Sequence, residues 1–287
     1  MNRFQSLTIP ALIGLFAGIA TLAADDESKA AIPADGEGAA QALLDSPRHG
    51  EWVDVALSES DTKIKTWISY PERKEKAPVV IVIHEIFGLT DWIRAVADQL
   101  AAEGFIAVAP DLLSGKGPDG GGTESFKGDS VRSAIRNLTD EQVNVRLDAV
   151  REHAAALPAA TDTFATIGFC WGGSTSFQYA TAQPQLDAAI VYYGTAPMSE
   201  DQPDSAALAK IACPVLGLYG GDDARVTSTV QATDAAMKEA GKLFTHSVYE
   251  GAGHGFLRQQ SGRDSANLKA ARQAWTETIA FLRTNLE

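Results

Sequence analysis

Short, continuous apolar runs alternate along most of the chain with longer segments in which apolar residues recur at helical spacing. Such short apolar runs are typical of strands that are buried on both faces, as in a parallel sheet. The expected strands are residues 79–83, 105–109, 164–169, 188–193, 215–219 and 244–249. The expected helices are residues 92–102, with Asp91 as N-cap, and residues 141–156, 173–182, 228–240 and 266–286. This alternation predicts an α/β fold with a mostly parallel, doubly wound sheet in one domain.

The pattern is different at the start of the folded region. Residues 52–57 and 63–70 are separated by the polar segment 58–62 and are expected to form two strands of a hairpin. Polar and apolar side chains alternate from Lys63 to Ile68, as expected for a sheet face that is half exposed. The sheet is therefore predicted to carry an N-terminal antiparallel hairpin at its edge.

The first residues have the order of a secretory signal peptide. Arg3 provides a basic start, residues 9–22 are apolar, and Ala23 and Ala24 follow as small residues. The alternative is an uncleaved anchor helix, but the run is shorter than the about 20 apolar residues that span a bilayer. We therefore expect residues 1–24 to be a cleaved signal peptide. The mature protein would then be periplasmic or secreted, without stable membrane association.

Composition narrows the remaining possibilities. Residues 25–50 are rich in Ala, Gly and acidic residues without a clear period, which predicts a flexible arm before a domain at residues 51–287. The net charge of −13 argues against a nucleic acid partner, and it disfavours anionic substrates unless arginines gather locally. No Cys or His spacing indicates a metal site, and no cofactor is expected. The Gly-rich segment 115–128 is expected to be a mobile surface loop near the site.

The strongest chemical motif is Gly-Phe-Cys-Trp-Gly-Gly at residues 168–173. It follows an expected strand and precedes an expected helix, which is the arrangement of a nucleophile elbow with Cys170 in place of serine. Side chains at Gly168 and Gly172 would clash in such a strained turn. A helix N-terminus favours the thiolate. The alternative is a buried structural cysteine, which is how we interpret Cys213.

A cysteine nucleophile needs a base and a carboxylate that orients this base. His254 lies in a Gly-rich loop after the expected strand 244–249, whereas His246 falls within that strand. Asp222 and Asp223 both follow the strand 215–219, and spacing alone does not decide between them. The amide of Trp171, directly after the nucleophile, is expected to form half of an oxyanion hole.

Five motifs together resemble the dienelactone hydrolase family from about residue 52 to the C-terminus. They are residues 84–89 (His-Glu-Ile-Phe-Gly-Leu), 109–112 (Ala-Pro-Asp-Leu), 168–173, 220–226 (Gly-Gly-Asp-Asp-Ala-Arg-Val) and 253–256 (Gly-His-Gly-Phe). The resemblance implies an α/β-hydrolase fold and hydrolysis of an ester or lactone, as by a carboxymethylenebutenolidase. The Gly-x-x-Asp-x-x-Val pattern of the family matches Gly220, Asp223 and Val226, which selects Asp223 over Asp222.

The resemblance also implies roles for residues that spacing cannot identify. Glu85 would contact the resting thiol and help to activate it when substrate binds, and its position after the strand 79–83 agrees with this role. The amide of Ile86 would complete the oxyanion hole. Arg258 would bind a carboxylate of the substrate. A second substrate arginine is expected upstream of the nucleophile, where Arg132 and Arg136 are both candidates.

The expected function is therefore hydrolysis of a small ester or lactone by Cys170, His254 and Asp223 through an acyl-enzyme. Two alternatives belong to other classes. One is a non-catalytic periplasmic ligand-binding protein on the same fold, against which the complete triad argues. The other is a thiol redox protein, which would need a resolving cysteine that the sequence does not provide.

Overall fold

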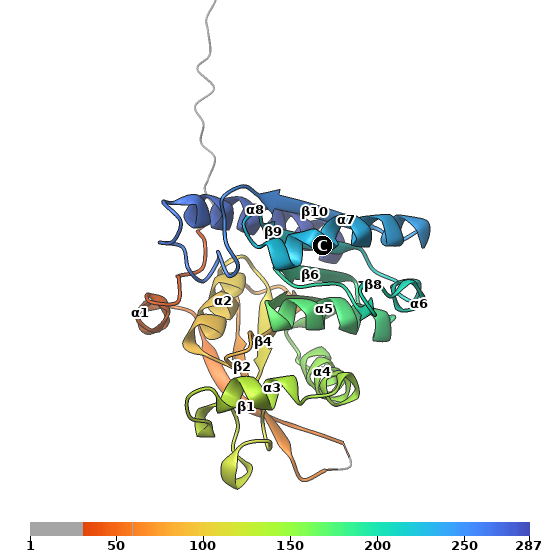
Figure 1. The fold of residues 1–287 in the computed structure, drawn as a ribbon. Coiled ribbons are helices and arrows are strands. Elements are labelled where there is room, and N and C mark those ends of the chain that lie inside the picture. The colour runs from red at the N-terminus through yellow and green to blue at the C-terminus, as the bar shows by residue number, and fades with distance from the viewer. Residues whose placement is uncertain (1–30, 59) are drawn as a thin grey trace, which may run out of the picture.

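The computed structural model describes residues 31–58 and 60–287, so the predicted signal peptide lies outside the described residues. The central feature is an eight-stranded sheet with the strand order β1-β2-β4-β3-β5-β6-β9-β10 (Figure 1). Its strands are β1 (Gly50–Ala56), β2 (Lys63–Ser69), β3 (Ala77–Ile83), β4 (Ile106–Pro110), β5 (Ala160–Phe169), β6 (Ala188–Tyr192), β9 (Val215–Gly220) and β10 (Phe244–Tyr249). The β1–β2 and β2–β4 pairs are antiparallel, whereas all the others are parallel. The predicted α/β fold with an N-terminal antiparallel hairpin is confirmed.

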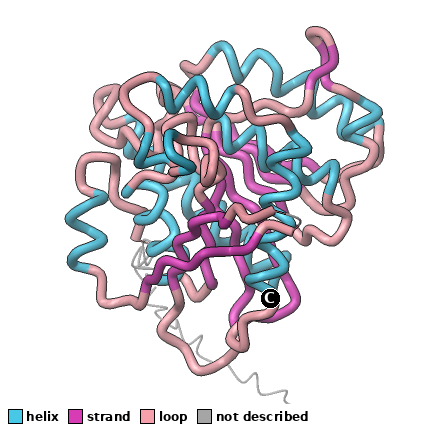
Figure 2. Tube along the Cα trace, turned by 90° about the horizontal axis from the view of Figure 1, so that it is seen from below, coloured by secondary structure: helices cyan, strands magenta, loops and turns pink. Residues whose placement is uncertain are grey.

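Helices cover both faces of the sheet, and Figure 2 shows them around the central strands. The α-helices are α1 (Ala39–Asp45), α2 (Asp91–Ala102), α3 (Ser130–Arg136), α4 (Asp140–Ala155), α5 (Trp171–Ala182), α6 (Ser205–Leu208), α7 (Ala224–Glu239) and α8 (Ala266–Leu286). Val80 and Val82 of β3 pack with α2 and α8, whereas Ile81 and Ile83 pack with α4 and α5. This alternation explains why β3 is apolar at every position and buried throughout.

The predicted helices exist; α8 has the predicted bounds, whereas the other four begin earlier than predicted. Asp91 is the first residue of α2, and Thr90 occupies the N-cap position that we expected for Asp91. The helix α7 begins at Ala224, four residues before the predicted start at residue 228. The helices α3 and α6 and the small pair β7 (Met198–Ser199) and β8 (Gln202–Pro203) were not expected. Elements this short span too few turns to show a clear period in the sequence. The helix α6 depends on Asp204, whose Oδ1 accepts bonds from the amides of Ala206 and Ala207.

The segment expected to be a flexible arm differs from that expectation in its described part. The helix α1 forms within it and lies against α2 (Figure 1). The adjoining Ser46 and Arg48 both donate hydrogen bonds to Asp98 of α2. Further along the chain, Gln260 donates to the carbonyl of Pro33. These long-range contacts order a segment whose own sequence lacks a periodic pattern.

The loop 115–128 is fastened to the end of β4 by the buried carboxylate of Asp111. This carboxylate accepts bonds from the backbone N–H of Leu113 and from both the amide and the hydroxyl of Thr123. Among residues 31–58 and 60–287, no helix combines the length and apolar character needed to cross a bilayer.

Candidate active site

Cys170 lies at the sharp turn between β5 and α5, where the sequence predicts a nucleophile elbow. Its φ of +57° is in the left-handed region that side chains rarely adopt. A Cβ on Gly168 would overlap the backbone of Gly172, and one on Gly172 would overlap the carbonyl oxygens of Ile83 and His84. The two glycines therefore let the turn pack directly against the end of β3, which places the thiol above the sheet.

His254 and Asp223 form a close pair, and the charge of Asp223 acts on the Cys170 thiol. The Nδ1 atom of His254 lies 2.5 Å from Oδ2 of Asp223, and Asp223 is 8% exposed. Asp222 turns away instead and pairs with Arg263, with 2.6 Å between Oδ2 and Nη1. The geometry thus agrees with the choice of Asp223 over Asp222. Because Nδ1 is engaged by the carboxylate, Nε2 of His254 is the ring nitrogen that can exchange a proton with a reactant.

Glu85 lies directly after β3 and is 4% exposed. Its Oε2 atom is 3.4 Å from Nε of Arg258, yet neither atom has a hydrogen-bond partner within the described residues. Burial raises the pKa of the Glu85 carboxyl to about 7, although the charge of Arg258 opposes the shift. Glu85 can therefore exchange a proton near neutral pH.

The resting thiol of Cys170 favours its neutral form. Burial raises its pKa, and the negative charge of Glu85 raises it further. The backbone N–H of Trp171 and the charge of Arg225 act in the opposite direction but do not prevail. The helix N-terminus alone is thus insufficient to produce a thiolate in the resting enzyme, and a change in the surrounding charges is needed.

His84 fixes the segment that carries Glu85. Its buried ring bonds through Nδ1 to the carbonyl of Glu85, and through Nε2 it accepts the amide of Leu112. Burial lowers the pKa of His84, so the ring stays neutral, and it stacks on Trp171 with 5.5 Å between ring centroids. His84 therefore links the ends of β3 and β4 to the helix that begins at the elbow.

Tyr193 is a residue of the site that the sequence analysis did not single out. It was included in the predicted strand 188–193, but β6 ends one residue earlier and Tyr193 has a φ of +40°. The side chain is 1% exposed, and its hydroxyl has no hydrogen-bond partner among the described residues. Its ring meets that of His254 edge-on at 5.1 Å. Burial raises the pKa of Tyr193, and the charges of Glu85 and Cys170 raise it further. A position just beyond a parallel strand was the available signal.

A cavity of about 410 Å³ opens beside the thiol. Ile86 and Trp171, the residues expected to supply the oxyanion hole, both line it together with Cys170. Its charged lining consists of Arg136 and Arg225, and the second of these was not predicted. The cavity is therefore locally cationic in a chain of net charge −13.

Arg132, the other candidate for a second substrate arginine, is not among the residues that line the cavity, and neither is Arg258. It pairs instead with Asp129, with 3.1 Å between Nη1 and Oδ1. Its guanidinium lies over the ring of Phe87, as does that of Arg258, at 5.1 and 4.8 Å from the ring centroid. The positions thus favour Arg136 over Arg132 as the second arginine.

The two remaining groups considered in the sequence lie apart from this site. Cys213 is 6% exposed and unpaired, and burial raises its pKa to about 12. His246 lies on β10, where Nδ1 is 3.8 Å from the carboxylate of Asp234. In the part of the chain that the structure describes, no three His, Cys, Asp or Glu side chains are grouped as metal ligands would be.

Comparisons with known proteins agree with the fold and show the family. The model of the dienelactone hydrolase family matches residues 64–286. A Salmonella typhimurium protein named "Putative carboxymethylenebutenolidase" is 35% identical over 242 residues, covering 79% of this chain and 88% of that protein. A Yersinia pestis protein of the same name is 30% identical over 233 residues, covering 79% and 85%. The crystal structure titled "Putative Dienelactone Hydrolase" from Klebsiella pneumoniae is 29% identical, with a TM-score of 0.69 over 81% of this chain and 97% of that one.

The raised pKa of Glu85 has a consequence for stability. The folded protein retains a proton on this carboxyl between pH 4.5 and about 7, where the unfolded chain has lost it. This group therefore favours folding below pH 4.5, and the advantage is lost as the pH rises to about 7. The side chain of the Glu85→Gln variant cannot ionise, so the variant does not lose this stability. The free energy of unfolding of the variant minus that of wild type should therefore rise as the pH goes from 4.5 to about 7, by at most about 3 kcal/mol.

Urea unfolding at several pH values measures this difference. The matched control is Glu250→Gln, an exposed residue in the loop that carries His254. The difference between control and wild type should be nearly constant with pH. If the difference in free energy of unfolding between Glu85→Gln and wild type is equally constant with pH, Glu85 does not titrate in this window.

Proposed function

This chain belongs to the dienelactone hydrolase family and is an ester or lactone hydrolase, and we propose that it works through a triad of Cys170, His254 and Asp223. The observation that supports this triad most is the 2.5 Å contact between His254 and Asp223 beside a cysteine at an elbow. Proteins named for carboxymethylenebutenolidase among its relatives support a lactone as the substrate class.

In the proposed first half-reaction, Sγ of Cys170 attacks the carbonyl carbon of the substrate. The thiol proton passes to Nε2 of His254, and Asp223 stabilises the resulting imidazolium. The backbone N–H groups of Ile86 and Trp171 stabilise the oxyanion. The C–O bond then breaks, the alcohol oxygen takes the proton from His254, and the acyl group remains on Cys170 as a thioester.

In the second half-reaction, water attacks the thioester carbonyl and gives a proton to His254. The C–S bond breaks, the acid is released, and the proton returns to the sulfur. No cofactor is required by this sequence of steps. For a lactone, the alcohol is part of the acyl group, so hydrolysis of the thioester releases a single hydroxy acid.

Glu85 and Arg258 provide a means of activating the resting thiol. The thiol is neutral at rest, in part because Glu85 carries negative charge beside it. A substrate carboxylate bound by Arg258 would compete with Glu85 for the guanidinium. Glu85 would then lose the charge that lowers its pKa and would take up a proton from solvent more readily. Its negative charge would then no longer oppose the transfer of the thiol proton to His254.

We further propose that the enzyme acts after export, as a periplasmic or secreted protein. The support is the order of Arg3, the apolar run 9–22 and the small residues Ala23 and Ala24. Its partner would be a small-molecule substrate rather than nucleic acid or a membrane. The intact mass of the exported protein tests this proposal, and a chain that retains residues 1–24 would contradict it.

The triad predicts a specific pattern of mutant kinetics. Cys170→Ala and His254→Ala should each lower kcat by about 10⁴-fold or more, because each removes a group that acts in bond formation. The double variant should be little worse than either single variant, since the residues act as one unit. The matched controls Cys213→Ala and His246→Ala should retain near-normal kcat. Substantial turnover by Cys170→Ala would refute the nucleophile assignment.

The arginines predict a preference for anionic substrates. The test compares a lactone that bears a carboxylate with the same lactone bearing a carboxamide. Arg258→Ala should raise KM for the anionic lactone about tenfold or more relative to the neutral one, as expected for a charged hydrogen bond. Arg136→Ala should also raise the ratio of the KM for the anionic lactone to the KM for the neutral lactone, whereas the control Arg132→Ala should leave this ratio unchanged. Equal effects on both lactones would indicate a structural role for the arginines.

A further inference from the structure

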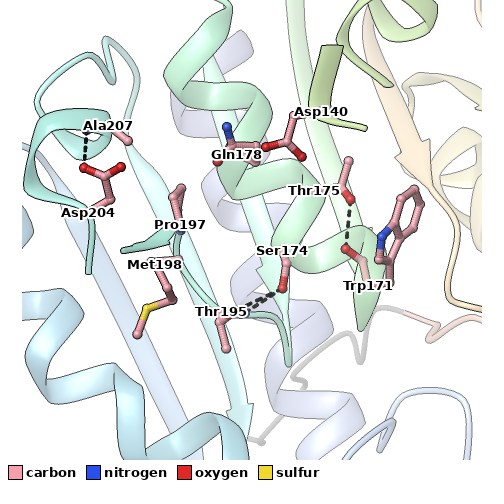
Figure 3. A pocket seen from close by; sticks show the side chains of 11 residues that line it. Asp140, Trp171, Ser174, Thr175, Gln178, Thr195, Pro197, Met198, Asp204 and Ala207 are labelled. Atoms are coloured by element: carbon pink, nitrogen blue, oxygen red, sulfur yellow. Dashed lines mark hydrogen bonds between the residues drawn. The ribbon is translucent and has the colours of Figure 1, made fainter. Parts of the chain in front are cut away.

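A second cavity, of about 340 Å³, adjoins the catalytic cavity. The two share three lining residues, namely Trp171, Ser174 and Thr195. Figure 3 shows Trp171 and Thr175 of α5 on one side and Asp204 and Ala207 on the opposite side. A group bound there would therefore be close to a substrate carbonyl at Cys170, without occupying the catalytic cavity.

The charges of the two cavities are opposite. The charged residues that line the second cavity are Asp140 and Asp204, whereas those of the catalytic cavity are Arg136 and Arg225. Within residues 31–58 and 60–287, no ion pair joins Asp140 or Asp204 to a cationic side chain. Both carboxylates thus lack a neutralising partner from the described part of the chain.

Individual polar groups that line the second cavity can also accept a hydrogen bond or an ion pair from a ligand. Only Oδ1 of Asp204 accepts the amides that begin α6, so Oδ2 is not used for capping. Burial and then the charge of Glu141 raise the pKa of Asp140, as expected for a carboxylate without a compensating cation. The hydroxyl and amide oxygens of Ser174, Thr175 and Gln178 are further acceptors in the lining.

We propose that this second cavity is a subsite for a positively charged ammonium group of the substrate. The two carboxylates would neutralise the cation, and the indole of Trp171 provides an aromatic wall of the kind that attracts ammonium groups. The proposal rests on the proposed hydrolysis at Cys170. It adds that the substrate is an ester or lactone with an amine or quaternary ammonium substituent on its alcohol or acyl part. Such a group is compatible with an anionic group at the arginines of the catalytic cavity, because the two occupy different spaces.

The test uses two pairs of esters that differ only in charge. In the first pair the alcohol part varies, and choline butyrate is compared with 3,3-dimethylbutyl butyrate. In the second pair the acyl part varies, and an ester of 4-(trimethylammonio)butyrate is compared with the same ester of 5,5-dimethylhexanoate. In at least one pair, wild type should prefer the cationic ester by about fivefold in kcat/KM, as expected from two partly exposed ion pairs.

The variant Asp140→Asn/Asp204→Asn should remove this preference and leave hydrolysis of the neutral esters unchanged. Asparagine retains the side-chain oxygen that caps α6, so the fold should be preserved. The matched control is Glu141→Gln/Asp201→Asn. It removes the same number of charges from adjacent exposed positions that do not line the cavity, and it should keep the preference.

Two results would overturn the proposal. One is the absence of a cationic preference in both pairs, and the other is an equal loss of preference in the cavity variant and the control. Calorimetric binding of the same esters to Cys170→Ala separates the subsite from the chemistry. If wild type hydrolyses neither the cationic nor the neutral esters, the proposed hydrolysis of esters fails. The subsite would still be supported if the cationic esters bind more tightly than the neutral ones and if this difference depends on Asp140 and Asp204. It would be refuted if cationic and neutral esters bind equally.

Discussion

The close approach of two backbone segments governs the chemistry of this protein. Gly172 packs against the carbonyl oxygens of Ile83 and His84 at the end of β3, and Gly168 packs against the backbone of Gly172, so neither position has room for a side chain. This packing forces Cys170 to its positive φ and sets the thiol beside Glu85, which follows β3. It also sets the start of α5, so the amide of Trp171 reaches the sulfur. The positions of nucleophile, carboxylate and amide donor therefore depend on one contact between β3 and the elbow.

Burial then determines how these groups behave. Three buried polar atoms at this site, Oε2 of Glu85, Nε of Arg258 and the hydroxyl of Tyr193, have no hydrogen-bond partner among the described residues. Such atoms are costly in a folded protein, and they are tolerated mainly where a ligand or a catalytic step uses them. Burial also keeps the Cys170 thiol neutral at rest. The site is thus arranged so that a polar substrate can supply the missing partners.

Local patterns in the sequence predicted the features that depend on neighbouring residues. The apolar runs predicted the strands, and the glycines around Cys170 predicted the elbow. Two adjacent aspartates stayed ambiguous from spacing alone, because the distinction depends on Arg263, which is distant in sequence and pairs with Asp222. The order in α1 was missed for the same reason, since it depends on contacts with α2 and Asp98. The position of Tyr193 in the site was not predicted, because a one-residue difference in the end of β6 decides whether it lies in the strand or in the site.

The central claim is that catalysis proceeds through a thioester on Cys170. Acid quenching during turnover of an ester, followed by proteolysis and mass spectrometry, tests it most directly. The account predicts that the peptide containing Cys170 gains the mass of the acyl group. This adduct should form and decay at least as fast as steady-state turnover, and the peptide containing Cys213 should remain unmodified. Turnover with an unmodified Cys170 peptide under conditions that preserve thioesters, or an acyl group on another residue, would contradict the account.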